Sequence, residues 1–199
     1  MTESDEAALG NKKRFEERWF QVLSLAIFGI CVSLSFVCWG TIAAHYLWPA
    51  LRTLPRSRSL RLLLLVHSFR FIGLAFMVPG VVSPDLSAEF ARPAAYGDLI
   101  AAVLALVAIV GLASKFGIGL VWVFNLWGVA DLLYAFYQGL IGVGIKPGQL
   151  GTAFFIPTVA VPLLFVTHVL IFRILMRGDG EATAQDPNSL AENKSPTKR

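Results

Sequence analysis

One long hydrophobic stretch of this chain, residues 120–140, carries polar side chains that could do chemistry. A carboxylate near the centre of a membrane helix costs about 3 kcal/mol on insertion scales, so Asp131 is expected to face a partner or a cavity. At about 100° per residue, one helical face collects five side chains: Phe124, Trp127, Asp131, Tyr134 and Gln138. Asn125 and Gly128 lie to one side of this face. The other helices are therefore expected to cover it or to line a cavity with it.

Two further hydrophobic stretches hold polar residues at matching depth. Counted from the ends near Leu60, Ile118 and Leu175, three residues lie about 10 Å deep at about 1.5 Å per residue: His67, Asn125 and His168. Arg70 lies only about 4–5 Å from the level of Asp131 on the same scale. An arginine side chain bridges that difference, so we predict an Arg70–Asp131 ion pair. The network around it is expected to include His67, Asn125, Tyr134 and His168.

Three roles are open for this cluster. Polar residues between membrane helices fix packing and register, at roughly 0.6 kcal/mol per hydrogen bond. The same groups could relay protons or bind a small solute, because ionisable residues inside membranes mark such paths. A third role is a b-type haem held between His67 and His168, which lie at matched depth on different helices.

Catalytic and metal sites are not indicated. The sequence has no HExxH motif and no Cys/His ligand cluster, and it places no second buried carboxylate near Asp131. Asp98 is expected in the first turn of its helix, where it serves as an N-cap or pairs with Arg92 at the membrane interface. We therefore expect no catalytic residue and no metal, and no cofactor unless the haem alternative holds.

Five hydrophobic segments are long enough to cross a bilayer, which takes about 20 residues each. They are residues 19–48, 60–82, 97–113, 118–140 and 153–176. Ser83 as N-cap and Pro84 at the first helical position predict a short interfacial helix that ends before Pro93. Polar tails are expected at residues 1–18 and 178–199, the second disordered. The predicted fold is all-α, a single five-helix transmembrane domain.

Composition supports a membrane protein and argues against a nucleic-acid-binding one. The chain is 56% hydrophobic and 15% charged, whereas soluble domains carry about 25% charged residues. Its formal charge of +4 comes from basic residues clustered at the ends of hydrophobic runs, as in membrane proteins. The expected partner is the lipid bilayer, and a membrane-protein partner or a second copy stays open.

Two motifs resemble those of a group of small bacterial polytopic membrane proteins that have no known activity. They are FARPAAYGD, at Phe90–Asp98, and N-x-x-G-x-x-D-L, at Asn125–Leu132. In that group an FA-x-PA-x-x-GD segment opens one span and a WN-x-x-G-x-x-D segment lies in the next; here Phe124 replaces the Trp. The likeness covers roughly residues 60–140. The resemblance supplies no activity. It implies that five residues are important: Arg70, Asp98, Asn125, Gly128 and Asp131.

The charge rule for loops nearly balances the two orientations in the membrane. With the amino terminus outside, the cytoplasmic side holds Arg52, Arg56, Arg58, Arg61, Lys115, Arg173 and Arg177. The reverse orientation places the basic amino-terminal tail, Arg92 and Lys146 there. We expect the amino terminus outside and the carboxyl terminus inside a bacterial inner membrane.

The leading functional expectation is a membrane protein that handles a proton or small solute through its buried polar cluster, or an accessory subunit of a membrane complex. The alternatives are a haem-binding electron-transfer protein and a purely structural or interaction protein. None of these readings predicts an enzyme.

Overall fold

The computed structural model describes residues 3–177, with side chains from residue 10 onward. Within that range the regular structure is helical, with one isolated bridge between Pro79 and Val82. Five helical stretches are long and apolar enough to cross a membrane: Gly10–Leu51, Arg56–Met77, Ala88–Gly111, Gly117–Gly142 and Ile156–Leu175. The prediction of an all-helical chain with five such stretches is confirmed. The tail expected at 178–199 lies outside the described residues.

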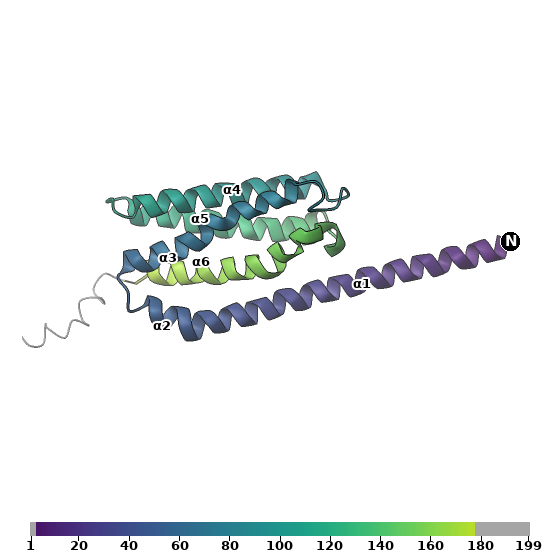
Figure 1. The fold of residues 1–199 in the computed structure, drawn as a ribbon, viewed down its shortest axis with the longest axis horizontal. Helices are drawn as coiled ribbons and strands as arrows, with labels where there is room; N and C mark the ends of the chain where they lie inside the picture. The colour runs from purple at the N-terminus through teal and green to yellow at the C-terminus, as the bar shows by residue number, and fades with distance from the viewer. Residues whose placement is uncertain (1–2, 178–199) are drawn as a thin grey trace, which may run out of the picture.

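The first stretch is much longer than a membrane span. Helix α1 runs from Glu3 to Ile42, continues through the π-helical turn η1 (Ala43–Leu47) and ends in α2 (Trp48–Leu51). Residues expected to form a polar tail are thus helical from Glu3 onward. The amino-terminal half of α1 projects well beyond the other helices, as Figure 1 shows. Its remaining length packs against the last helix of the bundle.

Helix α4 (Ala88–Gly111) lies along the edge of the bundle opposite α1, as Figure 1 shows. It packs against α3 (Arg56–Ser68), the 3₁₀ helix η2 (Phe69–Met77) and α5 (Gly117–Tyr137). Seven of its buried residues are alanines: Ala91, Ala94, Ala95, Ala101, Ala102, Ala105 and Ala108. Small side chains let helix backbones approach closely in membrane bundles. This close packing brings η2 and α5 together beside the same stretch of α4, where Arg70 of η2 reaches both helices.

The prediction of a separate interfacial helix before Pro93 is wrong. Ser83 instead belongs to a turn, in which its hydroxyl accepts a hydrogen bond from the Asp85 amide. Ser87 caps α4 by accepting from the Glu89 amide, and the helix continues through Pro93. Pro93 lacks the N–H that would pair with the Glu89 carbonyl. Because Glu89 is exposed, water can reach this turn and satisfy that carbonyl.

The last helix begins at a pair of prolines. The π-helical turn η3 (Gln138–Gly142) and the 3₁₀ helix η4 (Pro147–Phe154) connect α5 to the π-helical turn η5 (Ile156–Ala160), which leads into α6 (Val161–Leu175). The sequence predicts that Pro157 and Pro162 free carbonyls for a neighbouring helix to satisfy. The Trp39 indole of α1 lies close to this segment, where its Nε1 donates to the Val159 carbonyl at 3.2 Å. That carbonyl is next to the one at Thr158, which Pro162 would leave free in an α-helix, so the prediction is not tested by this bond.

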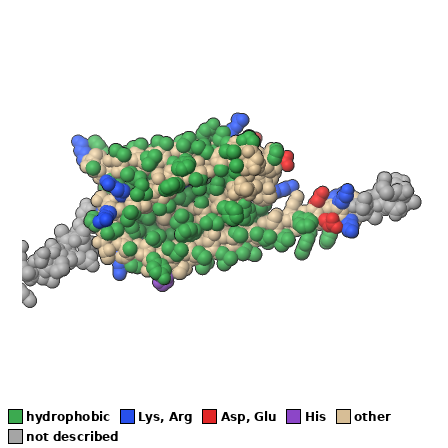
Figure 2. Space-filling model, in the orientation of Figure 1, with side chains coloured by type: hydrophobic (Ala, Val, Ile, Leu, Met, Phe, Trp, Pro, Cys, Tyr) green, Lys and Arg blue, Asp and Glu red, His purple; other side chains and the backbone are tan. Residues whose placement is uncertain are grey.

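Hydrophobic side chains cover much of the outer surface of the bundle, and basic residues gather at one end, as Figure 2 shows. We call this the arginine-rich end; its exposed basic residues are Arg52, Arg58, Arg61, Lys115 and Arg173. One hydrophobic cluster, around Leu60, Phe124 and Ile171, fills the bundle toward that end. Another, around Phe76 and Phe90, fills the opposite end. Between the two clusters lie six of the buried polar residues: His67, Arg70, Asp98, Asn125, Thr167 and His168.

Candidate functional site

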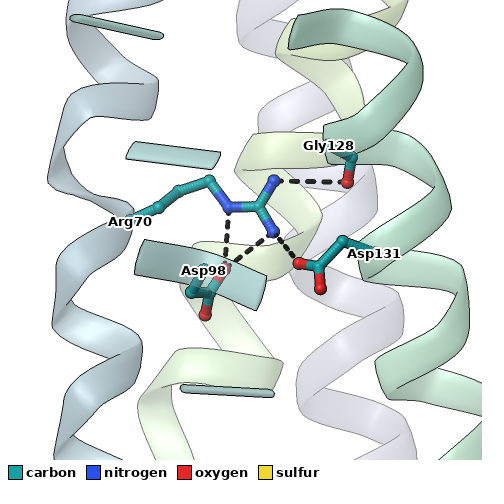
Figure 3. A network of polar contacts seen from close by, with 4 residues as sticks. All are labelled: Arg70, Asp98, Gly128 and Asp131. Atoms are coloured by element: carbon teal, nitrogen blue, oxygen red, sulfur yellow. Dashed lines mark hydrogen bonds and ion pairs between the residues drawn. The ribbon is translucent and has the colours of Figure 1, made fainter. Parts of the chain in front are cut away.

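Arg70 of η2 is the centre of a buried ion-pair network, shown in Figure 3. Its Nε donates to Asp98 Oδ1 at 2.7 Å, and its Nη2 lies 2.7 Å from the same oxygen. Nη2 also donates to Asp131 Oδ2 at 2.6 Å, and Nη1 donates to the Gly128 carbonyl at 3.2 Å. The ion pair predicted between Arg70 and Asp131 is therefore present. Asp98 of α4 is a second carboxylate partner, which the sequence analysis missed.

The two carboxylates carry more negative charge than the guanidinium neutralises. With both ionised, the three side chains have a net charge of −1. Each carboxylate uses one oxygen for Arg70, and among the described residues Asp98 Oδ2 and Asp131 Oδ1 have no hydrogen-bond donor. Figure 3 shows these two oxygens turned away from Arg70. The Asp98 and Asp131 side chains are each 11% exposed, whereas that of Arg70 is fully buried.

Two glycines make room for the carboxylates. A methyl group at Gly73 of η2 would overlap the Asp98 carboxylate, and one at Gly97 of α4 would overlap that of Asp131. Each glycine thus lets a carboxylate lie directly against a helix backbone. The geometry of the network depends on these small residues as much as on the charges.

A second polar layer lies between Arg70 and the arginine-rich end. His168 Nδ1 of α6 lies 2.7 Å from Asn125 Oδ1, while Asn125 Nδ2 donates to the His168 carbonyl at 3.4 Å. The asparagine oxygen therefore accepts from His168 Nδ1–H, which leaves His168 Nε2 as an acceptor. Among the described residues this Nε2 has no partner, although it is buried. A methyl group at Gly128 would touch both this edge of His168 and Arg70 Nη1.

His67 joins this layer through Thr167. The Thr167 hydroxyl lies 3.0 Å from His67 Nε2 and donates to the backbone of α6 at Leu163 or Leu164. It therefore accepts from His67 Nε2–H. The His67 and His168 rings are in contact, with centroids 4.2 Å apart. Both histidines belong near the network, as predicted.

These positions do not fit a haem between the two histidines. A bis-histidine haem places the macrocycle between its axial rings. Rings that already touch leave no space for it, since each face of an inserted plane needs a contact distance of about 3.5 Å. Phe124 also packs on both, with its ring centroid 5.1 Å from that of His67 and 5.4 Å from that of His168. Within the described residues no group of three or more His, Cys, Asp or Glu could hold a metal ion.

Tyr134 and Arg92 are not part of the site. Tyr134 is 48% exposed, and its hydroxyl accepts from Gln138 Nε2 on the outside of α5. Trp127 is also exposed, so the buried face of α5 is rotated from the predicted one toward Asn125 and Gly128. Arg92 is exposed, whereas Asp98 is buried against Arg70 in the third turn of α4. The predicted N-cap or Asp98–Arg92 pair is wrong.

A cavity of about 70 Å³ lies beside the carboxylates. Asp98 and Asp131 are the only residues lining it whose side chains carry charge or form hydrogen bonds. The rest of the wall is hydrophobic and includes Phe28 of α1 as well as residues of η3 and η4. The cavity thus extends from the carboxylates toward the end of the bundle opposite the arginine-rich end.

A family model described as a domain of unknown function, DUF8737, matches residues 27–176. The match includes the whole ion-pair network and the cavity. The chain belongs to the DUF8737 family. Comparison with curated proteins and with solved structures gives no match. In this DUF8737 member, the evidence for function is therefore the site itself, with two carboxylates, one arginine and a cavity.

Gly128 gives a direct test of the site's packing in this DUF8737 protein. Gly128→Ala should lower the free energy of unfolding by about 1–3 kcal/mol, because the methyl group overpacks against His168 and Arg70. Gly119→Ala in the same helix is the matched control, since nothing lies within 4 Å of the added methyl group. It should be neutral or stabilising by up to about 1 kcal/mol. Unfolding in mixed detergent micelles measures both, and equal effects would contradict the packing described.

Proposed function

We propose that this chain is an integral membrane protein that binds and releases a proton or a small solute at Asp98 and Asp131. The five long, apolar helices support insertion into a bilayer. Charged groups halfway along membrane helices need a protein interior around them, and the bundle encloses the Arg70 network in this way. A bacterial inner membrane with the amino terminus outside agrees with the basic residues at the arginine-rich end.

The observation that carries the proposal is the uncompensated carboxylate pair at the cavity. A buried network that only holds helices together is most stable when its charges balance. Here two carboxylates share one guanidinium, and both have an oxygen free of hydrogen bonds to the described residues. A proton or a cation on those oxygens would balance the charge.

Further polar groups continue from the carboxylates toward the arginine-rich end. Arg70 comes next, followed by the layer that holds His168 with Asn125 and His67 with Thr167. Phe124, which is fully buried, packs beside both histidines. This order suits a path that is open to the cavity on one side and gated on the other by the hydrophobic cluster, which has to open when an ion crosses.

A structural role is the competing proposal, because Arg70 joins η2, α4 and α5. The two roles differ in what they require of Asp131. Asp131→Asn keeps the Arg70–Asp98 pair, so the bundle should still fold. A structural network would then lose little, whereas a site that takes up a proton or cation would lose its function.

The test is ion flux in liposomes that hold the purified protein and an internal pH-sensitive dye. Under an inside-negative potassium diffusion potential, the wild-type protein should acidify the lumen faster than empty liposomes do. Asp131→Asn should slow this flux by about 100-fold, because it removes a positioned proton-binding group. Asp85→Asn, at an exposed carboxylate in the turn before α4, is the control and should match wild type. Flux equal to that of empty liposomes, or unchanged by Asp131→Asn, would favour the structural role.

A further inference from the structure

The polar part of the cavity wall, formed by Asp98 and Asp131, suits only a positively charged ligand. Arg70 does not line it, and each of the three guanidinium nitrogens already donates to Asp98, Asp131 or the Gly128 carbonyl. An anion would therefore meet carboxylates and no positive group. A neutral solute would leave the net negative charge of the network in place. The ligand that fits these two carboxylates is a cation.

The free oxygens are positioned to accept hydrogen bonds from that cation. Asp98 is 8% exposed overall, and its Oδ2 has no hydrogen bond among the described residues. Asp131 Oδ1 is in the same position, and both oxygens turn away from Arg70 (Figure 3). Two carboxylates that line the same cavity match a donor with several N–H groups, through short charge-assisted hydrogen bonds.

The walls of the cavity argue against a metal ion. Calcium takes about six to eight oxygen ligands, and magnesium takes about six in a strict octahedron. The cavity offers the oxygens of two aspartates, of which one on each residue is already paired with Arg70. None of its other lining residues carries an oxygen in its side chain. A metal ion would have to keep most of its water shell against hydrophobic walls.

The same walls favour a ligand with a hydrophobic body. Four phenylalanines line the cavity: Phe28, Phe76, Phe90 and Phe136. Hydrocarbon groups gain free energy by leaving water for such a surface. Aromatic faces also attract a cation that lies within about 6 Å of the ring centre. The ligand should therefore combine a positive nitrogen with an alkyl group.

The volume limits how large this ligand can be. The cavity measures about 70 Å³. A water molecule in the liquid takes about 30 Å³, so the space holds two waters or a body of a few heavy atoms. Methylammonium and ethylammonium, with two and three heavy atoms, fit within this space.

We propose that the cavity binds a small alkylammonium ion, with its N–H groups on Asp98 and Asp131 and its alkyl group against the phenylalanines. This rests on the proposed function and names the solute class for that site. The ion occupies the position that a proton would otherwise fill, so one positive charge balances the network in either case.

The test is binding of radiolabelled methylammonium to the purified full-length protein in detergent, with competition by unlabelled ions. Binding should be saturable, and ethylammonium should compete. Tetramethylammonium, which has no N–H group, should compete at least about tenfold less well, since it makes no hydrogen bond to the carboxylates. Asp131→Asn should abolish binding, and Asp85→Asn should leave it unchanged.

A second variant blocks the space and leaves the charges alone. Ala135 lines the cavity, so Ala135→Leu should fill it and lower methylammonium affinity. No saturable binding to wild type, or equal binding to Asp131→Asn, would overturn the inference. If methylammonium fails to bind but flux still depends on Asp131, the proposed function stands and the alkylammonium inference falls. If methylammonium binds but no flux is found, the alkylammonium inference is supported and the proposed proton transport is contradicted.

Discussion

Arg70→Met is expected to lower the free energy of unfolding by about 3–5 kcal/mol, the range found when one partner of a buried ion pair is removed. The substitution keeps an unbranched side chain of similar length, so the loss arises from charge. Asp98 and Asp131 would then lie together with no positive partner, and the Gly128 carbonyl would lose its donor. Equilibrium unfolding by titration with SDS in mixed micelles measures the change.

Two variants separate this charge effect from a general loss of arginine. Arg61→Met removes an exposed arginine from α3 and should change stability by less than about 0.5 kcal/mol. Arg70→Lys keeps the positive charge but loses the planar fork that reaches both carboxylates, so its loss should be intermediate. An Arg70→Met protein as stable as the Arg61→Met protein would mean that the network contributes nothing to the fold.

The Arg70–Asp131 contact could be predicted because both residues lie on helices that leave the same end of the bundle. Depth along two such helices can be counted from a shared origin at about 1.5 Å per residue. The same counting placed His67, Asn125 and His168 at one level, where they do lie together. It could not show that the two histidine rings touch, since depth says nothing about how far apart two helices are.

The sequence does not predict the Arg70–Asp98 contact, because Pro93 favours a helix that begins at Gly97, whereas α4 begins at Ala88. Proline is tolerated inside a helix where water can satisfy the carbonyl that it leaves free. With the helix begun at Ser87 as N-cap, Asp98 moves from the first turn to the third and reaches the depth of Arg70. The alanine-rich face of α4 is the signal that this helix packs closely against its neighbours.

The predicted rotation of α5 is wrong for a related reason. Polar and aromatic residues at helical spacing predict a buried face that includes Trp127 and Tyr134. In the structure Gly128 marks that face, because His168 and Arg70 need the space that its missing side chain leaves. In a membrane bundle, small residues indicate close approach better than aromatic ones do.

The carboxylates themselves should show strong non-additivity. Asp98→Asn and Asp131→Asn each remove one negative charge and leave Arg70 with one carboxylate partner, so each should stay within about 1 kcal/mol of wild type in stability. The double variant leaves a buried guanidinium without any carboxylate, and should lose about 3–5 kcal/mol. A double-mutant cycle, measured by SDS unfolding, gives the coupling free energy as the difference.

This cycle distinguishes a network that needs both carboxylates from one in which a single carboxylate suffices for Arg70. If both carboxylates were needed for packing, each single substitution would already cost several kcal/mol, because a buried partner would be left unpaired. Stable single variants would mean that one carboxylate suffices for Arg70 and that the other is free for a ligand. Stable folding of Asp131→Asn together with loss of flux would then assign that role to Asp131. Additive losses in the cycle would instead make the Arg70 network a structural element alone.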